Sequence, residues 1–213
     1  MTDIDRLAVV DHLIYAAPDL DQGIQEMERL LGRRAAVGGR HPDFGTRNAL
    51  LGLGPKTYIE IIAPDPGLSG PPRGRLFGLD RLERPRLVTW VLRDEAIETR
   101  AAAAREAGLA LGEVQQGSRV RPDGVVVSWK VTDPYAMPLD GTVPFLIAWG
   151  TTPHPAASLA AAGQLLGLKV EHPQPQAVRA AFDALGVELS VGQGSRAQVI
   201  ATVRVDGRDV EIR

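Results

Sequence analysis

The sequence predicts an α+β fold of repeated β-α-β-β-β modules, with curved antiparallel sheets paired around a cleft. Three apolar stretches each run into an amphipathic helix that ends at a glycine: Gly32, Gly108 and Gly186, which lie 76 and 78 residues apart. This regular spacing indicates one supersecondary unit used three times. Each helix is followed by strand patterns joined by short turns, which favour antiparallel pairing. Because one such unit leaves a sheet face uncovered, we expect units to pair.

The first unit spans residues 1–67 and opens with a β-rich run at residues 9–16. Asp19 and Gln22 then form a capping-box pattern before a helix at residues 20–31. Apolar residues at helical spacing predict one buried stripe on this helix. The stripe consists of Leu20, Ile24, Met27, Leu30 and Leu31. We expect Gly32 to end the helix in the left-handed conformation, a glycine-rich loop at 38–48, and strands at 49–53 and 57–63.

Two further units follow, each after a connector. Residues 66–86 are rich in proline, glycine and arginine and form the first connector; residues 151–163 form the second. The second unit, residues 87–150, carries a strand at 87–92, a helix at 95–107 capped by Asp94, and strands at 111–115, 125–131 and 145–149. The third and shorter unit, residues 165–213, carries a strand at 168–172, a helix at 175–185, and strands at 187–191, 198–205 and 209–212.

Composition narrows the class of protein. The 213 residues include 24 Lys and Arg and 26 Asp and Glu, which are interspersed and give a net charge of −2. This balance argues against a nucleic acid or a membrane surface as partner. No apolar run reaches the roughly 18 residues needed to cross a bilayer. The start of the chain is acidic and makes a poor secretory signal. The absence of cysteine excludes disulfides, and we expect a cytoplasmic protein.

Several sequence stretches resemble a known superfamily. They are VDHLIYAAPDLD, GGRHPDFGTRNALLGLG, TYIEIIAPDP, RVRPDGVVVSWK and VPFLIAWG, which cover most of residues 9–155. Together with the repeat, they resemble the vicinal oxygen chelate superfamily, and more narrowly the glyoxalase-like domain proteins of bacteria. The resemblance implies a barrel of paired modules with a cup-shaped ligand site. Because the superfamily holds lyases, dioxygenases, epimerases, resistance proteins and non-catalytic binders, the resemblance leaves the reaction open.

The resemblance also implies metal ligands on the first and last strands of each of two modules. His12 occupies the first-strand position and Glu60 the last-strand position, and strand alternation can aim both into one concave face. Imidazole and carboxylate together suit Zn, Fe, Mn or Ni. In an enzyme of this type, Glu60 would also shuttle the proton. The alternative is structural: His12 makes a core hydrogen bond, and Glu60 pairs with an arginine.

The second unit departs from this ligand pattern. Val88 and Phe145 stand at the positions that correspond to His12 and Glu60, and neither can bind a metal. Glu211 in the third unit is a counterpart of Glu60, and it would complete a triad with His12 and Glu60 if units one and three pair. The alternative for Glu211 is a solvated acid. The cofactor is therefore either a divalent metal or none.

Ligand-binding candidates come from two segments. The glycine-rich segment 38–48 offers His41, Thr46 and Asn48 as a binding lip, or else forms a tight structural turn. Arg121 and Trp129 suit an anionic or aromatic small molecule if they line the cleft. The alternative places the tryptophans in the core and pairs Arg121 with Asp123.

Three function classes stay open at this stage. The first is a metal-dependent lyase, isomerase or dioxygenase that polarises neighbouring oxygens of its substrate. The second is a metal-free module that binds or sequesters a small molecule, and the third is an accessory interaction domain. In the first two, the partner is a small molecule, and whether the chain forms a homodimer is open.

Overall fold

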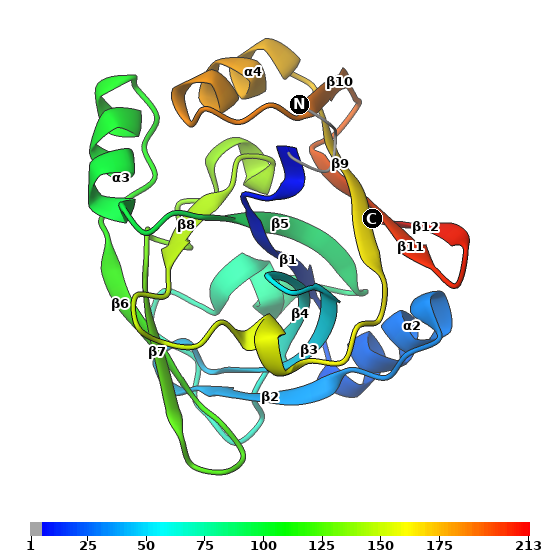
Figure 1. Cartoon of the computed structure of the whole chain (residues 1–213). Helices are drawn as coiled ribbons and strands as arrows, with labels where there is room; N and C mark the ends of the chain where they lie inside the picture. The colour runs from blue at the N-terminus through cyan, green and yellow to red at the C-terminus, as the bar shows by residue number, and fades with distance from the viewer. Residues whose placement is uncertain (1–5) are drawn as a thin grey trace.

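Eight strands of one continuous sheet close into a barrel, and four further strands form a second sheet beside it (Figure 1). The computed structural model describes residues 6–213; residues 1–5 of the predicted first unit lie outside the described residues. The first unit supplies β1 (Val10–Ala16), β2 (Ala36–His41), β3 (Thr46–Gly54) and β4 (Thr57–Pro64). The second supplies β5 (Arg86–Arg93), β6 (Gln115–Val120), β7 (Val126–Val131) and β8 (Phe145–Ala148). The α+β fold class with curved sheets is confirmed.

Units one and two form the two halves of the barrel. The strand order is β1-β4-β3-β2-β6-β7-β8-β5, so each half repeats the same internal arrangement. The first strand of each half pairs in parallel with its last strand, β1 with β4 and β5 with β8. The strands that follow the helix in each half pair antiparallel, as expected. The first and last strands of a half pair in parallel because a helix and two strands intervene between them. At the β2–β6 seam a single pair, Arg40 opposite Val120, joins the halves.

The first helix begins and ends where its sequence predicts. In α2 (Leu20–Leu31), the Asp19 carboxylate accepts hydrogen bonds from the amides of Asp21 and Gln22, and Gly32 follows with φ of 65°. The helix packs against β4 and β3 and buries most of its predicted stripe. Leu30 is the exception, since it is only partly buried at the edge of the core.

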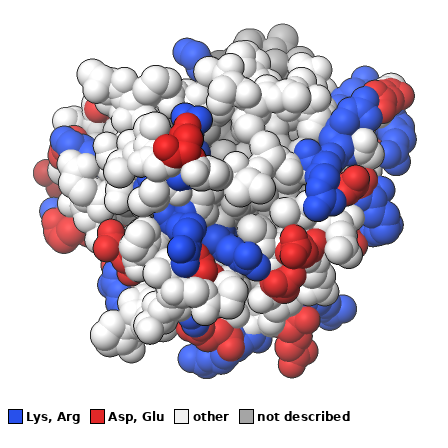
Figure 2. Space-filling model, turned by 90° about the horizontal axis from the view of Figure 1, so that it is seen from below, with Lys and Arg blue, Asp and Glu red and all other residues white. Residues whose placement is uncertain are grey.

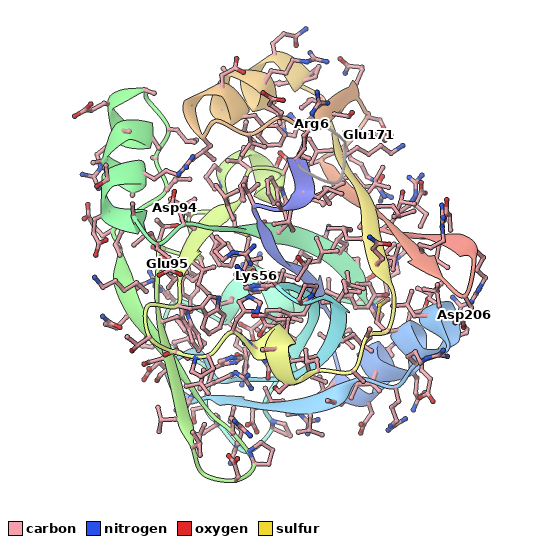
Figure 3. All side chains as sticks on the ribbon, in the orientation of Figure 1. Arg6, Lys56, Asp94, Glu95, Glu171 and Asp206 are labelled. Carbon is pink, nitrogen blue, oxygen red and sulfur yellow. The ribbon has the colours of Figure 1, made fainter. Side chains whose placement is uncertain are left out.

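The second helix starts two residues later than predicted. In α3 (Ile97–Glu106), Ala96 occupies the cap position, while the Asp94 carboxylate accepts the Ala96 amide at 2.8 Å and pairs with Arg100. Figure 3 shows Asp94 and Glu95 beside the start of α3. The Glu95 carboxylate accepts the amides that follow β8, at Trp149 and Gly150, and so ties the helix to the barrel. The strand predicted at 111–115 is wrong, because β6 begins only at Gln115.

The third unit keeps the predicted element order but pairs its strands differently. It contains β9 (Gln164–His172), α4 (Pro175–Ala184), β10 (Ser190–Gln193), β11 (Gln198–Val205) and β12 (Arg208–Ile212). Its sheet order is β10-β9-β11-β12, with the first strand in the interior rather than at an edge. This unit therefore forms a separate sheet. Units one and two close the barrel on themselves, so the pairing of units one and three that a site with Glu211 would require is not formed.

Two apolar clusters divide the interior. The larger one lies between the barrel wall, the helices and the second sheet, where Trp90 of β5 meets Phe182 of α4 edge to face at 6.0 Å. The smaller one lies inside the barrel and includes Ile14, Ile62 and Ile147. An eight-stranded barrel has an interior just wide enough to be filled by side chains or to hold one small ligand.

The surface carries both signs of charge. Figure 2 shows Lys and Arg interleaved with Asp and Glu on the face viewed from below. Within residues 6–213, no helix is long and apolar enough to cross a membrane.

Candidate functional site

A cavity of about 50 Å³ lies inside the barrel. By the usual yardstick of roughly 10–15 Å³ for one water, it has room for a few waters or for the small end of a ligand. The first half of the barrel supplies most of the polar and hydrogen-bonding lining: His12, His41, Asn48, Tyr58 and Glu60; Arg119 of the second half adds a cation. The second half supplies a largely apolar and aromatic wall: Trp129, Val131, Phe145, Ile147 and Trp149. The cavity is therefore chemically two-sided.

A bulge in β1 aims two neighbouring residues into one network. The register against β5 shifts between Val10 and His12, which leaves Asp11 as an extra residue on β1. Adjacent strand residues normally face opposite sides of a sheet, and a bulge breaks this alternation locally. As a result, Asp11 Oδ1 lies 2.7 Å from Nδ1 of His12, which lines the cavity.

Asp11 is fully buried and is held by groups from the far half of the chain. Its Oδ2 accepts the indole Nε1–H of Trp149 at 3.0 Å and lies 3.0 Å from His154 Nε2 and 3.3 Å from Arg93. Burial alone would raise the pKa of Asp11, but the hydrogen bonds from His12 and His154 outweigh it and hold the pKa well below its usual range. Asp11 therefore stays ionised behind the cavity wall.

His12 lies between two carboxylates. Its ring stacks on Tyr58 with centroids 4.5 Å apart, and its Nε2 lies 3.4 Å from Glu60 Oε2. Burial alone would lower the pKa of His12, but the hydrogen bonds and charges of Asp11 and Glu60 raise it to about 9. Since each ring nitrogen faces an ionised acceptor, His12 is an imidazolium at neutral pH.

Glu60 is the buried anion of the cavity. Its Oε1 accepts a hydrogen bond from Asn48 Nδ2 at 2.6 Å and lies 3.8 Å from His41 Nε2. Burial would raise the pKa of Glu60, but the hydrogen bond from His12 leads the opposing effects that lower it to about 2. A Cβ on Gly38 would lie 2.1 Å from Asn48 Oδ1, so glycine at this position gives Asn48 the space to reach Glu60.

The predicted binding lip is a hairpin rather than a loop. Strands β2 and β3 run through segment 38–48 and enclose a 3₁₀ turn, Pro42–Phe44. His41 lines the cavity, its Nδ1 lies 3.0 Å from Thr46 Oγ1, and its ring meets Trp129 edge to face at 6.1 Å. Burial lowers the pKa of His41, so this histidine is neutral at neutral pH. Thr46 itself is buried and acts on the cavity only through His41.

Two predicted site residues lie away from the cavity. Arg121 is exposed in the turn between β6 and β7, where it pairs with Asp123 at 2.8 Å. Glu211 is exposed on β12 of the second sheet, where it pairs with Arg213 at 2.5 Å. Both placements match the structural alternatives. Glu211 does not join His12 and Glu60, because its sheet is not part of the barrel.

The donor set does not fit the metal site that the resemblance implies. His12 and Glu60 come together, but Val88 and Phe145 stand at the corresponding positions of the second half and cannot bind a metal. Phe145 lines the cavity wall. Within residues 6–213, no group of three or more His, Asp or Glu side chains is arranged to hold a metal ion.

Sequence reasoning missed several residues that build the site. Asp11 lies 2.7 Å from His12, and the ring of Tyr58 stacks on it. His154 precedes a proline, which is typical of a loop, and from this loop it bonds to Asp11. Arg119 lines the cavity in place of Arg121. Because β6 ends at Val120, Arg119 lies in the strand, whereas Arg121 lies beyond its end.

Solved structures align with this chain at low sequence identity. A hypothetical protein from Staphylococcus aureus aligns with a TM-score of 0.61 at 15% identity, covering 95% of this chain and 83% of that chain. Methylmalonyl-CoA epimerase from Mycobacterium tuberculosis aligns with a TM-score of 0.41 at 19% identity, covering 66% of this chain and 87% of that chain. A Streptomyces coelicolor methylmalonyl-CoA epimerase variant aligns with a TM-score of 0.43 at 16% identity, covering 68% of this chain and 97% of that chain.

Sequence comparison identifies the family. A search of curated proteins finds no match to this chain. The family model described as "Glyoxalase-like domain" matches residues 10–186. Because this match runs from β1 through α4 and covers well over half of the chain, the protein belongs to the glyoxalase-like domain family.

Proposed function

We propose that the barrel binds a small carbonyl compound and that Glu60 and His12 move a proton on it, as in an isomerase. The observation that carries this proposal is the buried row Asp11–His12–Glu60, which opens onto a cavity with an apolar wall. A carboxylate and an imidazolium side by side are the two partners that proton abstraction next to a carbonyl requires.

The proton transfer can be written with this chain's own groups. Glu60, ionised, takes a proton from the carbon next to the carbonyl. The His12 Nε2–H donates a hydrogen bond to the carbonyl oxygen, where negative charge develops. Asp11 holds the His12 ring in place and keeps it protonated. Return of the proton from Glu60 to the same face of this carbon restores the substrate, whereas return to the opposite face inverts the carbon and is an isomerisation. Neither outcome changes the net number of protons.

Ligand binding itself would make Glu60 a stronger base. In the empty site His12 lies 3.4 Å from Glu60 and helps to lower the pKa of Glu60 to about 2. A carbonyl oxygen that takes the His12 hydrogen bond removes part of this stabilisation. The pKa of Glu60 then rises toward the range in which a carboxylate accepts protons effectively.

A second function, binding without turnover, is favoured by one observation. The low pKa of Glu60 makes it a weak base unless the ligand displaces the His12 hydrogen bond. A ligand that leaves this bond intact would be held against the aromatic wall and sequestered. The metal-dependent alternatives need ligands beyond His12 and Glu60, so no step is assigned to a metal.

Hydrogen exchange tests the proposal. Pyruvate and 2-oxobutanoate are incubated with the protein in D₂O, and deuterium entry next to the carbonyl is followed by NMR. We expect exchange with the wild type and at least a 100-fold loss in Glu60→Gln, since general-base catalysis contributes roughly 10²–10⁴-fold. Glu211→Gln, an exposed glutamate with the same chemical change, serves as the control. Binding of both probes without exchange supports sequestration and overturns the proton-transfer step.

A further inference from the structure

We infer that Arg119 anchors a carboxylate group of the ligand in the same cavity as the groups that move the proton. The inference deepens the proposed function and rests on it for the nature of the reaction. It names the substrate class as a small organic acid whose carboxylate is separate from the reacting carbon.

Arg119 is a buried cation without a partner. The residue is 6% exposed, it lines the cavity, and its Nη1 is buried with no hydrogen bond. Across residues 6–213, no carboxylate forms an ion pair with it, whereas Arg121, two residues along, pairs with Asp123. A buried charge without a counter-charge is costly, so its presence in a cavity wall indicates that another group completes it.

The carboxylates of the site already have hydrogen-bond partners other than Arg119. Glu60 is shared by His12 and Asn48, and Asp11 lies behind His12 with Trp149 and His154. The groups that sense the charge of Arg119 are His41 and Tyr58, and neither is an anion at neutral pH. The counter-charge therefore has to come from a ligand.

The backbone is shaped to seat this arginine. A Cβ on Gly39 of β2 would lie 2.4 Å from the Val120 carbonyl oxygen and 3.4 Å from Arg119 Nη1. Glycine at this position therefore permits the close approach of β6 at the seam where the two halves of the barrel meet. Arg119 enters the cavity at this seam, from the half that otherwise supplies apolar and aromatic lining.

Size and shape select a carboxylate. The planar guanidinium matches a carboxylate with two parallel hydrogen bonds. The cavity of about 50 Å³ suits a small planar group, and the wall of Trp129, Phe145 and Ile147 suits a short hydrocarbon segment. Bound in this way, one end of the acid lies at Arg119, and the rest extends toward Glu60 and His12.

A pair of matched probes tests the charge requirement. Propanoate and propanamide have nearly the same shape, and only propanoate carries a charge. Their binding is followed by the fluorescence of Trp129 and Trp149, which line the cavity, and by the shift in melting temperature. We expect the wild type to bind propanoate at least 10-fold more tightly than propanamide, and more tightly than inorganic phosphate.

Three variants then assign the effect to one side chain. Arg119→Gln should weaken propanoate binding at least 10-fold and leave propanamide unchanged, and its ligand-free melting temperature should not fall. Arg119→Lys should retain part of the preference for propanoate. Arg121→Gln, which removes the same charge from the exposed turn, should behave as the wild type. If Arg119→Gln does not fold, the wild type and Arg119→Lys decide the question through their preference for propanoate.

The outcomes separate this inference from the proposed function. Equal binding of propanoate and propanamide by the wild type, or wild-type affinity for propanoate in Arg119→Gln, overturns the anchor. Preference for inorganic phosphate overturns the choice of carboxylate. A second combination is that Arg119→Gln loses propanoate binding while the wild type shows no hydrogen exchange. This combination leaves the anchor standing and overturns the proton transfer alone. If Arg119→Gln still exchanges hydrogen and binds propanoate as tightly as the wild type, the anchor is overturned and the proton transfer stands.

Discussion

At the scale of single residues, the chemistry of this protein depends on how one extra residue is placed in β1. Asp11 and His12 are neighbours that would face opposite sides of a regular strand, and the bulge brings both into one hydrogen-bonded row with Glu60. The row contains one cation between two anions, and all three residues are buried. Its charge state is therefore linked to folding.

This linkage predicts how stability depends on pH. The pKa of His12 rises from 6.5 to about 9 on folding, so its contribution is fully present below pH 6.5 and is lost as the pH rises through 9. We expect the free energy of unfolding to fall by about 3 kcal/mol over this range. Urea unfolding at pH 6, 7.5 and 9 measures it. In His12→Gln this fall should disappear; an equal fall in the variant would assign the pH dependence to other groups.

At the scale of elements, α2 shows how far a local pattern specifies packing. The cap at Asp19, the stop at Gly32 and the apolar spacing all agree, and Met27 and Leu31 are fully buried against the sheet. Leu30 follows the same pattern but lies at the margin of the stripe, where it is only partly buried.

Neighbouring leucines in α2 provide a paired test. Leu31→Ala should lower the free energy of unfolding by roughly 2–5 kcal/mol, because it leaves a cavity in a closed core. Leu30→Ala makes the same chemical change and should cost less than about 2 kcal/mol, since the site is partly open. Chemical denaturation of both variants measures the difference. Equal costs would show that the two leucines are equally buried in solution.

At the scale of the whole molecule, the barrel and the second sheet share one apolar cluster. Trp90 of β5 and Phe182 of α4 meet within it, and both are almost completely buried. The sheet thus covers the outside of the barrel, while the cavity opens inside. Two bodies that share a core are expected to unfold together.

We predict that the barrel and the second sheet unfold in one cooperative transition. Phe182→Ala should destabilise the protein by about 3–5 kcal/mol, as for other buried aromatic truncations. Fluorescence reports on the barrel through its tryptophans, and circular dichroism reports on the whole chain. Both should shift to the same new midpoint in urea. Separate midpoints would show that the second sheet unfolds independently.

The sequence alone determined what depends on neighbours along the chain. Caps, helix stops and apolar spacing located three helices, and alternation with the family resemblance placed His12 and Glu60 on one face of the first barrel half. The apolar character of Phe145 was also visible, and it lines the cavity wall.

The tertiary structure decided what depends on pairing between distant segments. The bulge at Asp11 exists only against β5, and the choice of Arg119 over Arg121 depends on where β6 ends against β7. The separation of Glu211 from the site follows from the strand order of the third unit. Strand register and order are set by long-range hydrogen bonds and burial, which a local pattern does not contain.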